Sequence, residues 1–155
     1  MSRSAGLLLY RRPSGNGVEL LIVHMGGPFW KNKDAGGWSI PKGELEEGDD
    51  PLAVALREFE EELGTQAPGV ELVDLGEVRQ AGGKRVVVFA GESDFDADDI
   101  RSNTFTIEWP PRSGRQQEFP EVDRAAWVSA DEARVKLVKA QVEFVDRLLA
   151  LLGAG

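Results

Sequence analysis

The chain has 155 residues, 41% of them hydrophobic and 29% charged, which predicts a single globular domain over residues 1–155. Its formal net charge of −9 argues against binding to nucleic-acid polymers, because such binding relies on a basic surface. The lack of cysteine excludes disulfides and thiolate chemistry, and no apolar run approaches the roughly 20 residues of a membrane span. With no secretory signal pattern at the start, we expect a cytoplasmic protein.

The first part of the chain predicts a hairpin followed by a loop. Residues 5–12 and 18–25 are largely apolar and are separated by turn residues at 14–17, so they are interpreted as paired strands. His24, the only histidine, lies in the second strand and is interpreted as structural. Residues 26–37 contain too much glycine for regular structure. They carry Trp30 and two lysines, and form either a loop packed on itself or a flap that stacks a nucleobase.

A short strand over residues 38–43 leads into a predicted helix. Asp50 is a good N-cap, Pro51 suits the first helical position and Gly64 ends the helix. Apolar residues at steps of four, three and four form a stripe that is expected to face a core: Leu52, Leu56, Phe59 and Leu63.

Glutamates crowd the last two turns of this helix. Glu58, Glu61 and Glu62 share one face at i, i+3 and i+4. Each charge opposes the helix dipole at a cost of about 0.3–1 kcal/mol, and like charges four residues apart cost a further ~0.2–0.5 kcal/mol. Arg57 offsets only part of this repulsion. The pattern indicates either a solvated acidic face or a cation site, and carboxylate oxygens suit Mg²⁺ or Mn²⁺.

The segment from Gly43 to Thr65 resembles the signature of the Nudix hydrolase superfamily: Gly, five residues, Glu, seven residues, then Arg-Glu-apolar-any-Glu-Glu-any-Gly-apolar. Every spacing is kept, with Asp49 at the first glutamate position and Thr65 at the final apolar position. Trp-x-x-Pro-Lys-Gly at residues 38–43 and Leu-Tyr-Arg-Arg at residues 9–12 resemble the diadenosine tetraphosphatase branch, bis(5'-nucleosyl)-tetraphosphatase.

The remaining elements follow in order. Residues 71–80 and 85–90 predict a second hairpin, 93–101 an acidic solvated loop and 104–109 a strand. Residues 112–120 predict a long loop, whose Arg112 and Arg115 either hold phosphates or are solvated. Residues 121–128 predict a strand. Ser129 and Glu132 form a capping box, and residues 136–152 predict an amphipathic helix on one face of the sheet. This order agrees with the α/β fold implied by the resemblance, an α/β/α sandwich with a mixed central sheet.

The resemblance also implies chemistry, because Nudix enzymes hydrolyse a nucleoside diphosphate linked to another group. It makes Glu58 and Glu62 the principal metal ligands, Glu61 a ligand or a residue that positions water, and the Gly43 carbonyl a further ligand. Arg57 is expected to orient the glutamates. In the diadenosine tetraphosphatase branch, a glutamate six residues before a tryptophan of a late strand is the general base. Glu121 holds that position relative to Trp127, and Glu118 is the alternative.

Three functions remain open from the sequence. The first is a Mg²⁺- or Mn²⁺-dependent pyrophosphohydrolase of nucleoside polyphosphates, including dinucleoside tetraphosphates cleaved to ATP and AMP. The second is the same chemistry on ADP-ribose, an oxidised nucleoside triphosphate or a diphosphoinositol phosphate. The third is a nucleotide-sensing module without activity. For a substrate we expect contacts from Trp30, from Lys42, and from Arg11 or Arg12. The sequence leaves the oligomeric state open.

Overall fold

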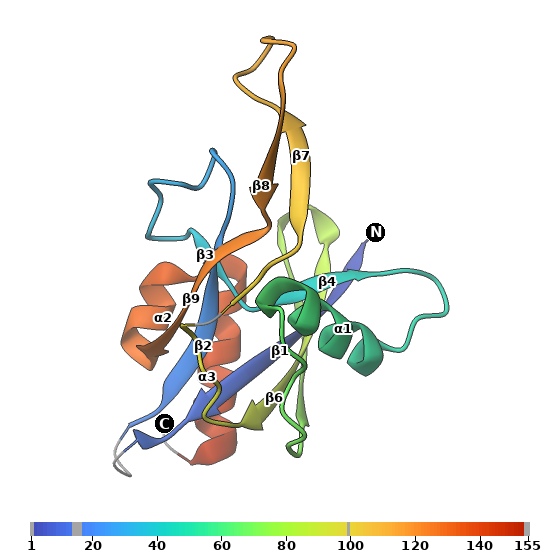
Figure 1. Cartoon of the computed structure of the whole chain (residues 1–155). Coiled ribbons are helices and arrows are strands. Elements are labelled where there is room, and N and C mark those ends of the chain that lie inside the picture. The colour runs from blue at the N-terminus through green and yellow to red at the C-terminus, as the bar shows by residue number, and fades with distance from the viewer. Residues whose placement is uncertain (1, 14–16, 99, 154–155) are drawn as a thin grey trace.

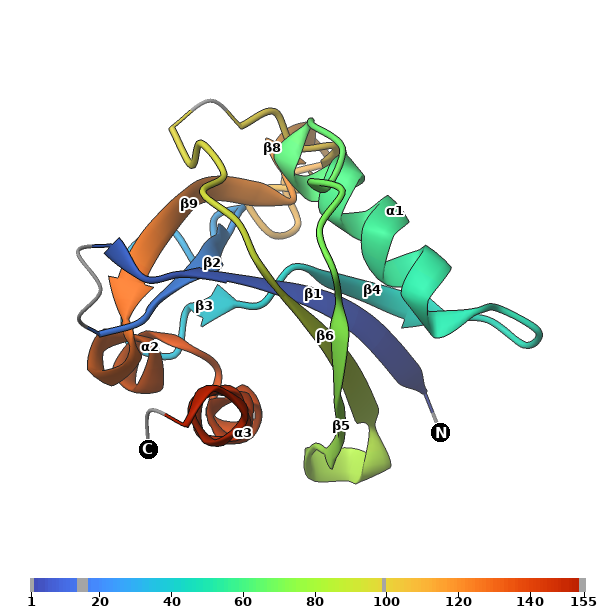
Figure 2. The same cartoon turned by 90° about the horizontal axis from the view of Figure 1, so that it is seen from below.

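The computed structural model describes residues 2–13, 17–98 and 100–153 as a mixed sheet between two helical layers (Figure 1). The view from below shows helix α1 on one side of the sheet and helices α2 and α3 on the other (Figure 2). The predicted α/β/α sandwich is therefore confirmed. The predicted turn at 14–17 lies outside the described residues, except for Gly17. Within those ranges no helix is long and apolar enough to cross a bilayer.

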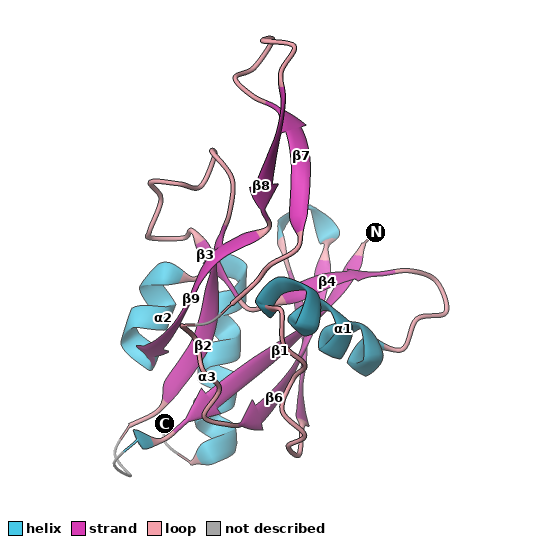
Figure 3. Ribbon diagram, in the orientation of Figure 1, coloured by secondary structure: helices cyan, strands magenta, loops and turns pink. Residues whose placement is uncertain are grey.

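The central sheet has the strand order β3-β2-β1-β6-β5, with β4 paired to β1 and β9 paired to β2. Strand β1 pairs in parallel with β6 along its length, and antiparallel with β4 at its start and β2 at its end. The strands of this sheet are coloured magenta in Figure 3, and their bounds are β1 Arg3–Arg11, β2 Glu19–Met25, β3 Trp38–Ser39, β4 Lys42–Leu45, β5 Val73–Arg79, β6 Arg85–Glu92 and β9 Val122–Ser129.

The two central strands are buried on both faces, which explains their continuous apolar sequences. Leu7 and Leu9 of β1 pack against the core beneath α1, whereas Leu8 packs against the core beneath α3. In β2, Leu21 faces the first core and Ile22 the second. Successive strand residues alternate between faces, so one run of leucines joins both helical layers.

Helix α1, Pro51–Leu63, begins and ends as predicted. The Asp50 side chain accepts a hydrogen bond from Ala53 N, and Gly64 adopts a left-handed φ of 77°. The predicted apolar stripe is partly wrong, because Leu52 and Leu56 are only half-buried. The residues that pack against the sheet are rotated slightly around the helix and include an acid: Val54, Ala55, Phe59, Glu62 and Leu63.

The single helix predicted for residues 136–152 is wrong, because the chain is interrupted there. The capping box of Ser129 and Glu132 starts α2, Ala130–Lys136. A short 3-10 turn, Lys139–Gln141, then precedes α3, Val142–Leu152. Val138 N donates instead to the Trp38 carbonyl at 2.9 Å. Residues 137–138 therefore pair with the edge of the sheet at Trp38. In a continuous helix their backbone groups would form hydrogen bonds within the helix instead.

The loop predicted at residues 112–120 is also partly wrong. Strand β8, Gln116–Pro120, pairs antiparallel with β7, Thr104–Glu108, and the two form a ribbon that projects from the body (Figure 1). The sequence of β8 is polar because most of its residues are exposed on the ribbon, so it lacks the apolar pattern that predicts a strand. The acidic segment 93–101 has no strand or helix in its described residues, but Phe95 packs edge-on against Phe59 at 5.2 Å. Residue 99 of this predicted loop lies outside the described ranges.

Candidate active site

The site is built around the last two turns of α1, where Glu62 is turned toward the sheet. Only 8% of Glu62 is exposed, and its carboxylate accepts a hydrogen bond from Lys42 N at 3.1 Å. Lys42 is the first residue of β4, which antiparallel pairing with β1 holds in place. The same strand therefore brings Lys42 and Gly43 alongside the acidic face of the helix.

Gly43 allows Glu58 to lie directly against the backbone of β4. A Cβ atom at position 43 would stand 2.1 Å from Glu58 Cδ, so the end of the Glu58 side chain would have to move. Glycine thus permits this close approach between strand and helix. Arg57 Nη2 lies 3.8 Å from Glu58 Oε1.

Glu121 comes from a later part of the chain and lies near the glutamates of α1. Asn103 N donates to the Glu61 carbonyl at 2.8 Å, and Glu121 N donates to the Asn103 carbonyl at 2.8 Å. On its other side, Gly26 N donates to the Glu121 carbonyl at 2.9 Å. These bonds tie the residue before β9 to the last turn of α1, so Glu121 faces the glutamates of the helix.

The carboxylates act on one another electrostatically. Burial, reinforced by the charges of Glu58 and Glu121, raises the pKa of Glu62 to about 8. Burial and the neighbouring Glu61 raise the pKa of Glu58. Partial burial, together with Glu61, raises the pKa of Glu121. These mutual effects place the four carboxyl groups in one cluster that favours protons or a cation.

The donors of this cluster fit a hard divalent cation, because they are carboxylate oxygens with a backbone carbonyl beside them. In the part of the chain that the structure describes, no three acidic or histidine side chains already converge in the geometry of a formed metal site.

A cavity of about 470 Å³ opens beside the cluster. The structure brings Trp30, Lys42, Glu62 and Glu121 together on its walls. Sequence reasoning missed most of its other lining residues, which come from β2, the β5–β6 turn and the segment after α2: Met25, Gln80, Lys84, Val138 and Gln141. No local motif marks these residues, because only folding joins them.

Other predicted site residues lie elsewhere. Arg11, predicted to contact the substrate, pairs with Glu19 at 2.7 Å and Asp94 at 2.8 Å and does not line the cavity. Its guanidinium also lies 4.5 Å over the ring of Trp127. Arg12 pairs with Glu92 at 3.1 Å.

The alternative base and the residue at the first glutamate position of the signature also stand apart from the cluster. Glu118 is exposed on the projecting ribbon, and Asp49 accepts a hydrogen bond from Glu46 N at 2.9 Å within the turn before α1. Asp49 therefore stabilises the approach to the helix in this structure.

A three-layer fold with a glutamate-rich helix end beside a cavity defines the class of this protein. The family model described as NUDIX domain matches residues 2–148, and the chain belongs to the Nudix superfamily.

Curated relatives carry the same domain in longer chains. The protein is 29% identical over 115 residues to Nudix hydrolase 5 of Arabidopsis thaliana, a match covering 74% of this chain and 33% of that protein. It is 29% identical over 147 residues to the 8-oxo-(d)GTP phosphatase of Mycolicibacterium smegmatis, covering 87% and 37%. The chain thus spans about a third of the length of these relatives.

Solved structures show the same fold at low sequence identity. A binary complex of the C. elegans Ap4A hydrolase superposes with a TM-score of 0.65 at 20% identity, covering 100% of both chains. The NUDIX domain of Shewanella oneidensis NrtR, complexed with ADP ribose, superposes with a TM-score of 0.66 at 18% identity, covering 97% of this chain and 87% of that one.

Proposed function

We propose that this protein hydrolyses a phosphoanhydride bond in nucleoside polyphosphates with the help of Mg²⁺ or Mn²⁺. The observation that supports the proposal is the electrostatic coupling of four carboxyl groups, three from the end of α1 and one just before β9, with the pKa of Glu62 raised to about 8. Crowded carboxylates in a half-buried site are unfavourable unless a cation offsets their charge.

Each residue of the cluster has a proposed role. Glu58 and Glu62 would hold the cation with the Gly43 carbonyl, and Glu61 would be a further ligand or would orient water. A bound divalent cation polarises phosphoryl oxygens and lowers the pKa of water. Arg57, at 3.8 Å from Glu58, keeps that carboxylate in place.

The reaction itself is the attack of water on a phosphorus of the bridge, with a nucleotide as leaving group. Glu121 accepts the proton of that water. Its raised pKa suits this role, since a general base works best with a pKa close to the working pH. Lys42 stands beside Glu62 on the cavity wall, where its ammonium group offsets phosphate charge. We infer that Trp30, on the same wall, stacks the nucleobase.

A second groove favours a substrate with two nucleosides. The groove, of about 490 Å³, lies between the 26–37 loop and the ribbon, with Trp109, Phe119 and Lys31 among its walls. Its aromatic faces and its cation suit a nucleobase and a phosphate. Pro120 lines this groove and Glu121 lines the cavity, so adjacent residues border the two spaces.

The wall between the groove and the cavity is thin. A Cβ atom on Gly26 would meet the Pro120 carbonyl at 2.0 Å, so two backbone segments touch there without side chains between them. A dinucleoside tetraphosphate has a base at each end and would reach both spaces. We therefore place it ahead of ADP-ribose, oxidised nucleoside triphosphates and diphosphoinositol phosphates. A sensing module without activity is disfavoured, because binding alone does not need a repulsive cluster.

The metal-site assignment is tested by Glu58→Gln, with Glu60→Gln as the matched control on the same helix. Loss of a metal ligand removes several kcal/mol of transition-state stabilisation, so we expect kcat to fall by more than about 100-fold. Glu60→Gln should retain activity within a few fold. Turnover is measured against Mg²⁺ concentration, and circular dichroism checks the fold. Unchanged turnover in Glu58→Gln would refute the assignment.

The substrate assignment is tested by Trp109→Ala. Stacking contributes about 1–3 kcal/mol per base, so KM for diadenosine tetraphosphate should rise about 5- to 150-fold. KM for ATP should stay near the wild-type value, since one nucleoside occupies only the cavity at Trp30. An equal effect on both substrates would show that the groove does not hold a second base.

A further inference from the structure

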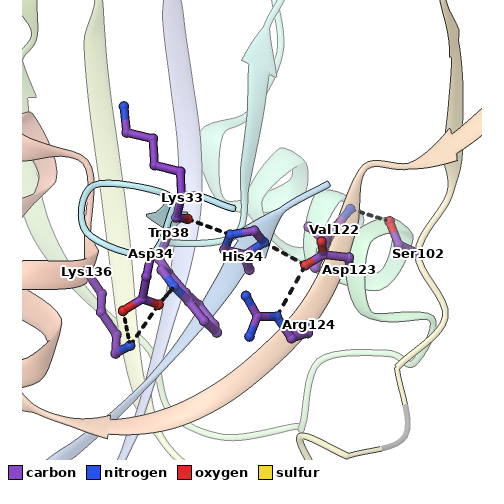
Figure 4. Close-up of polar contacts among 9 residues, drawn as sticks. All are labelled: His24, Lys33, Asp34, Trp38, Ser102, Val122, Asp123, Arg124 and Lys136. Carbon is purple, nitrogen blue, oxygen red and sulfur yellow. Dashed lines mark hydrogen bonds and ion pairs between the residues drawn. The ribbon is translucent and has the colours of Figure 1, made fainter. Parts of the chain in front are cut away.

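The only histidine of the chain is fully buried between two hydrogen-bond acceptors (Figure 4). His24 Nδ1 lies 2.7 Å from Asp123 Oδ1, and Nε2 lies 2.8 Å from the Lys33 carbonyl oxygen. A carbonyl oxygen and a carboxylate both accept hydrogen bonds and have none to donate. The ring therefore bridges two acceptors that belong to different parts of the chain, the 26–37 loop and strand β9.

Several charged groups surround the ring. Asp123 faces Nδ1 directly and also lies 3.7 Å from Arg124 Nε. The other charged groups stand around Trp38, whose ring contacts His24 edge-on at 5.2 Å. Arg124 lies over the Trp38 ring. Asp34 accepts from Trp38 Nε1 at 2.9 Å and pairs with Lys136 at 2.8 Å.

One partner of His24 belongs to the loop that carries Trp30. The Lys33 carbonyl accepts from the ring, while its backbone N–H donates to the Trp30 carbonyl at 3.0 Å. The ammonium group of Lys33 lies 5.1 Å from the centre of the Trp30 ring, and its side chain points away from His24 (Figure 4). Lys33 thus links His24 to Trp30 through both its backbone and its side chain.

The other partner belongs to the segment that carries Glu121. Asp123 stands two residues after Glu121, and the pairing of β2 with β9 is irregular between His24 and Met25. Regular sheet pairing is interrupted at this point, so side-chain contacts contribute more to the position of the strand. Val122 N, for example, donates to Ser102 Oγ at 3.0 Å.

We propose that His24 is a positioning residue whose two ring nitrogens lock the 26–37 loop to the segment carrying Glu121. The lock sets the distance between the aromatic wall of the cavity and the general base. Loss of the contact with Asp123 would let the loop and β9 move independently. The roles of Trp30 and Glu121 rest on the proposed function, whereas the lock does not.

The contact between His24 and Asp123 is measured by ¹⁵N NMR of the histidine ring, which is unambiguous because the chain has one histidine. Asp123→Asn should shift the Nδ1 resonance, while Asp131→Asn, at an exposed aspartate on α2, should leave it unchanged. An unchanged Nδ1 resonance in Asp123→Asn would overturn the proposal.

The lock is measured by hydrogen exchange at the amides of Trp30 and Lys33. Asp123→Asn removes a charge-assisted hydrogen bond, so exchange should accelerate about tenfold or more, with Asp131→Asn as the control. In the enzyme assay, Asp123→Asn should raise KM more than it lowers kcat. Unchanged exchange in Asp123→Asn would refute the lock. Altered exchange in a protein that turns over no nucleotide would leave the lock standing and refute the proposed function instead.

Discussion

At the scale of single residues, Glu62 is the most informative side chain. It is an acid with 8% exposure in the packed face of a helix, and its one hydrogen bond described above comes from Lys42 N. Buried acids without a cation are kept neutral by protonation. The residue therefore couples the stability of the domain to pH and to cation binding.

The pH dependence has a definite sign. With a pKa of about 8 in the folded protein and 4.5 in the unfolded chain, Glu62 binds more protons when folded at intermediate pH. The free energy of unfolding should therefore fall as pH rises from about 4.5 through about 8, by at most about 5 kcal/mol. Glu62→Gln should lose this part of the dependence, as measured by urea unfolding in EDTA. Parallel pH profiles for the variant and the wild type would contradict the assignment.

Gly43 offers a second test at this scale. Gly43→Ala would place Cβ 2.1 Å from Glu58 Cδ, and the flexible end of the glutamate is the group that can move. We expect kcat to fall about 10- to 100-fold because a ligand is displaced. The free energy of unfolding should change by less than ~1.5 kcal/mol. Both predictions are checked on one sample, by an activity assay for kcat and by urea unfolding for stability. Full activity in Gly43→Ala would show that catalysis does not require Glu58 to lie against β4.

At the scale of elements, the sequence predicts best what local chemistry decides. The ends of α1 follow from Asp50, Pro51 and Gly64, whose effects extend over a single turn. The break between α2 and α3 could not be predicted in this way. It depends on a hydrogen bond from Val138 to Trp38, a residue far earlier in the chain.

The difference between local and long-range interactions also explains which parts of the candidate site could be predicted. The spacing of Glu58, Glu61 and Glu62 on one helical face can be predicted, because helical periodicity is local. The groove at Trp109 could not be predicted, since it exists only where the 26–37 loop meets the ribbon. The ion pairs of Arg11 could not be predicted either, because its partners Glu19 and Asp94 meet it only in the folded chain.

At the scale of the whole molecule, the fold brings segments from both ends of the chain to one cavity. The sheet carries β4 and the 26–37 loop, α1 carries the glutamates, and the connection from β8 to β9 carries Glu121 (Figure 1). The net charge of −9 would repel a polyphosphate at long range. A bound divalent cation at the cluster would reverse that field locally, so substrate binding should depend on the metal.

The most direct test of this account is product analysis after incubation of the wild-type protein with a panel of substrates, with Mg²⁺ or with EDTA. The panel contains diadenosine tetraphosphate, ADP-ribose, 8-oxo-dGTP, ATP and a diphosphoinositol phosphate. We predict Mg²⁺-dependent conversion of diadenosine tetraphosphate to ATP and AMP, faster than turnover of the others and absent in EDTA. Mg²⁺-dependent preference for another member of the panel would support the metal-site assignment but overturn the substrate assignment. Equal turnover in EDTA, or no turnover of any member, would contradict the central claim that the carboxylate cluster holds a catalytic cation.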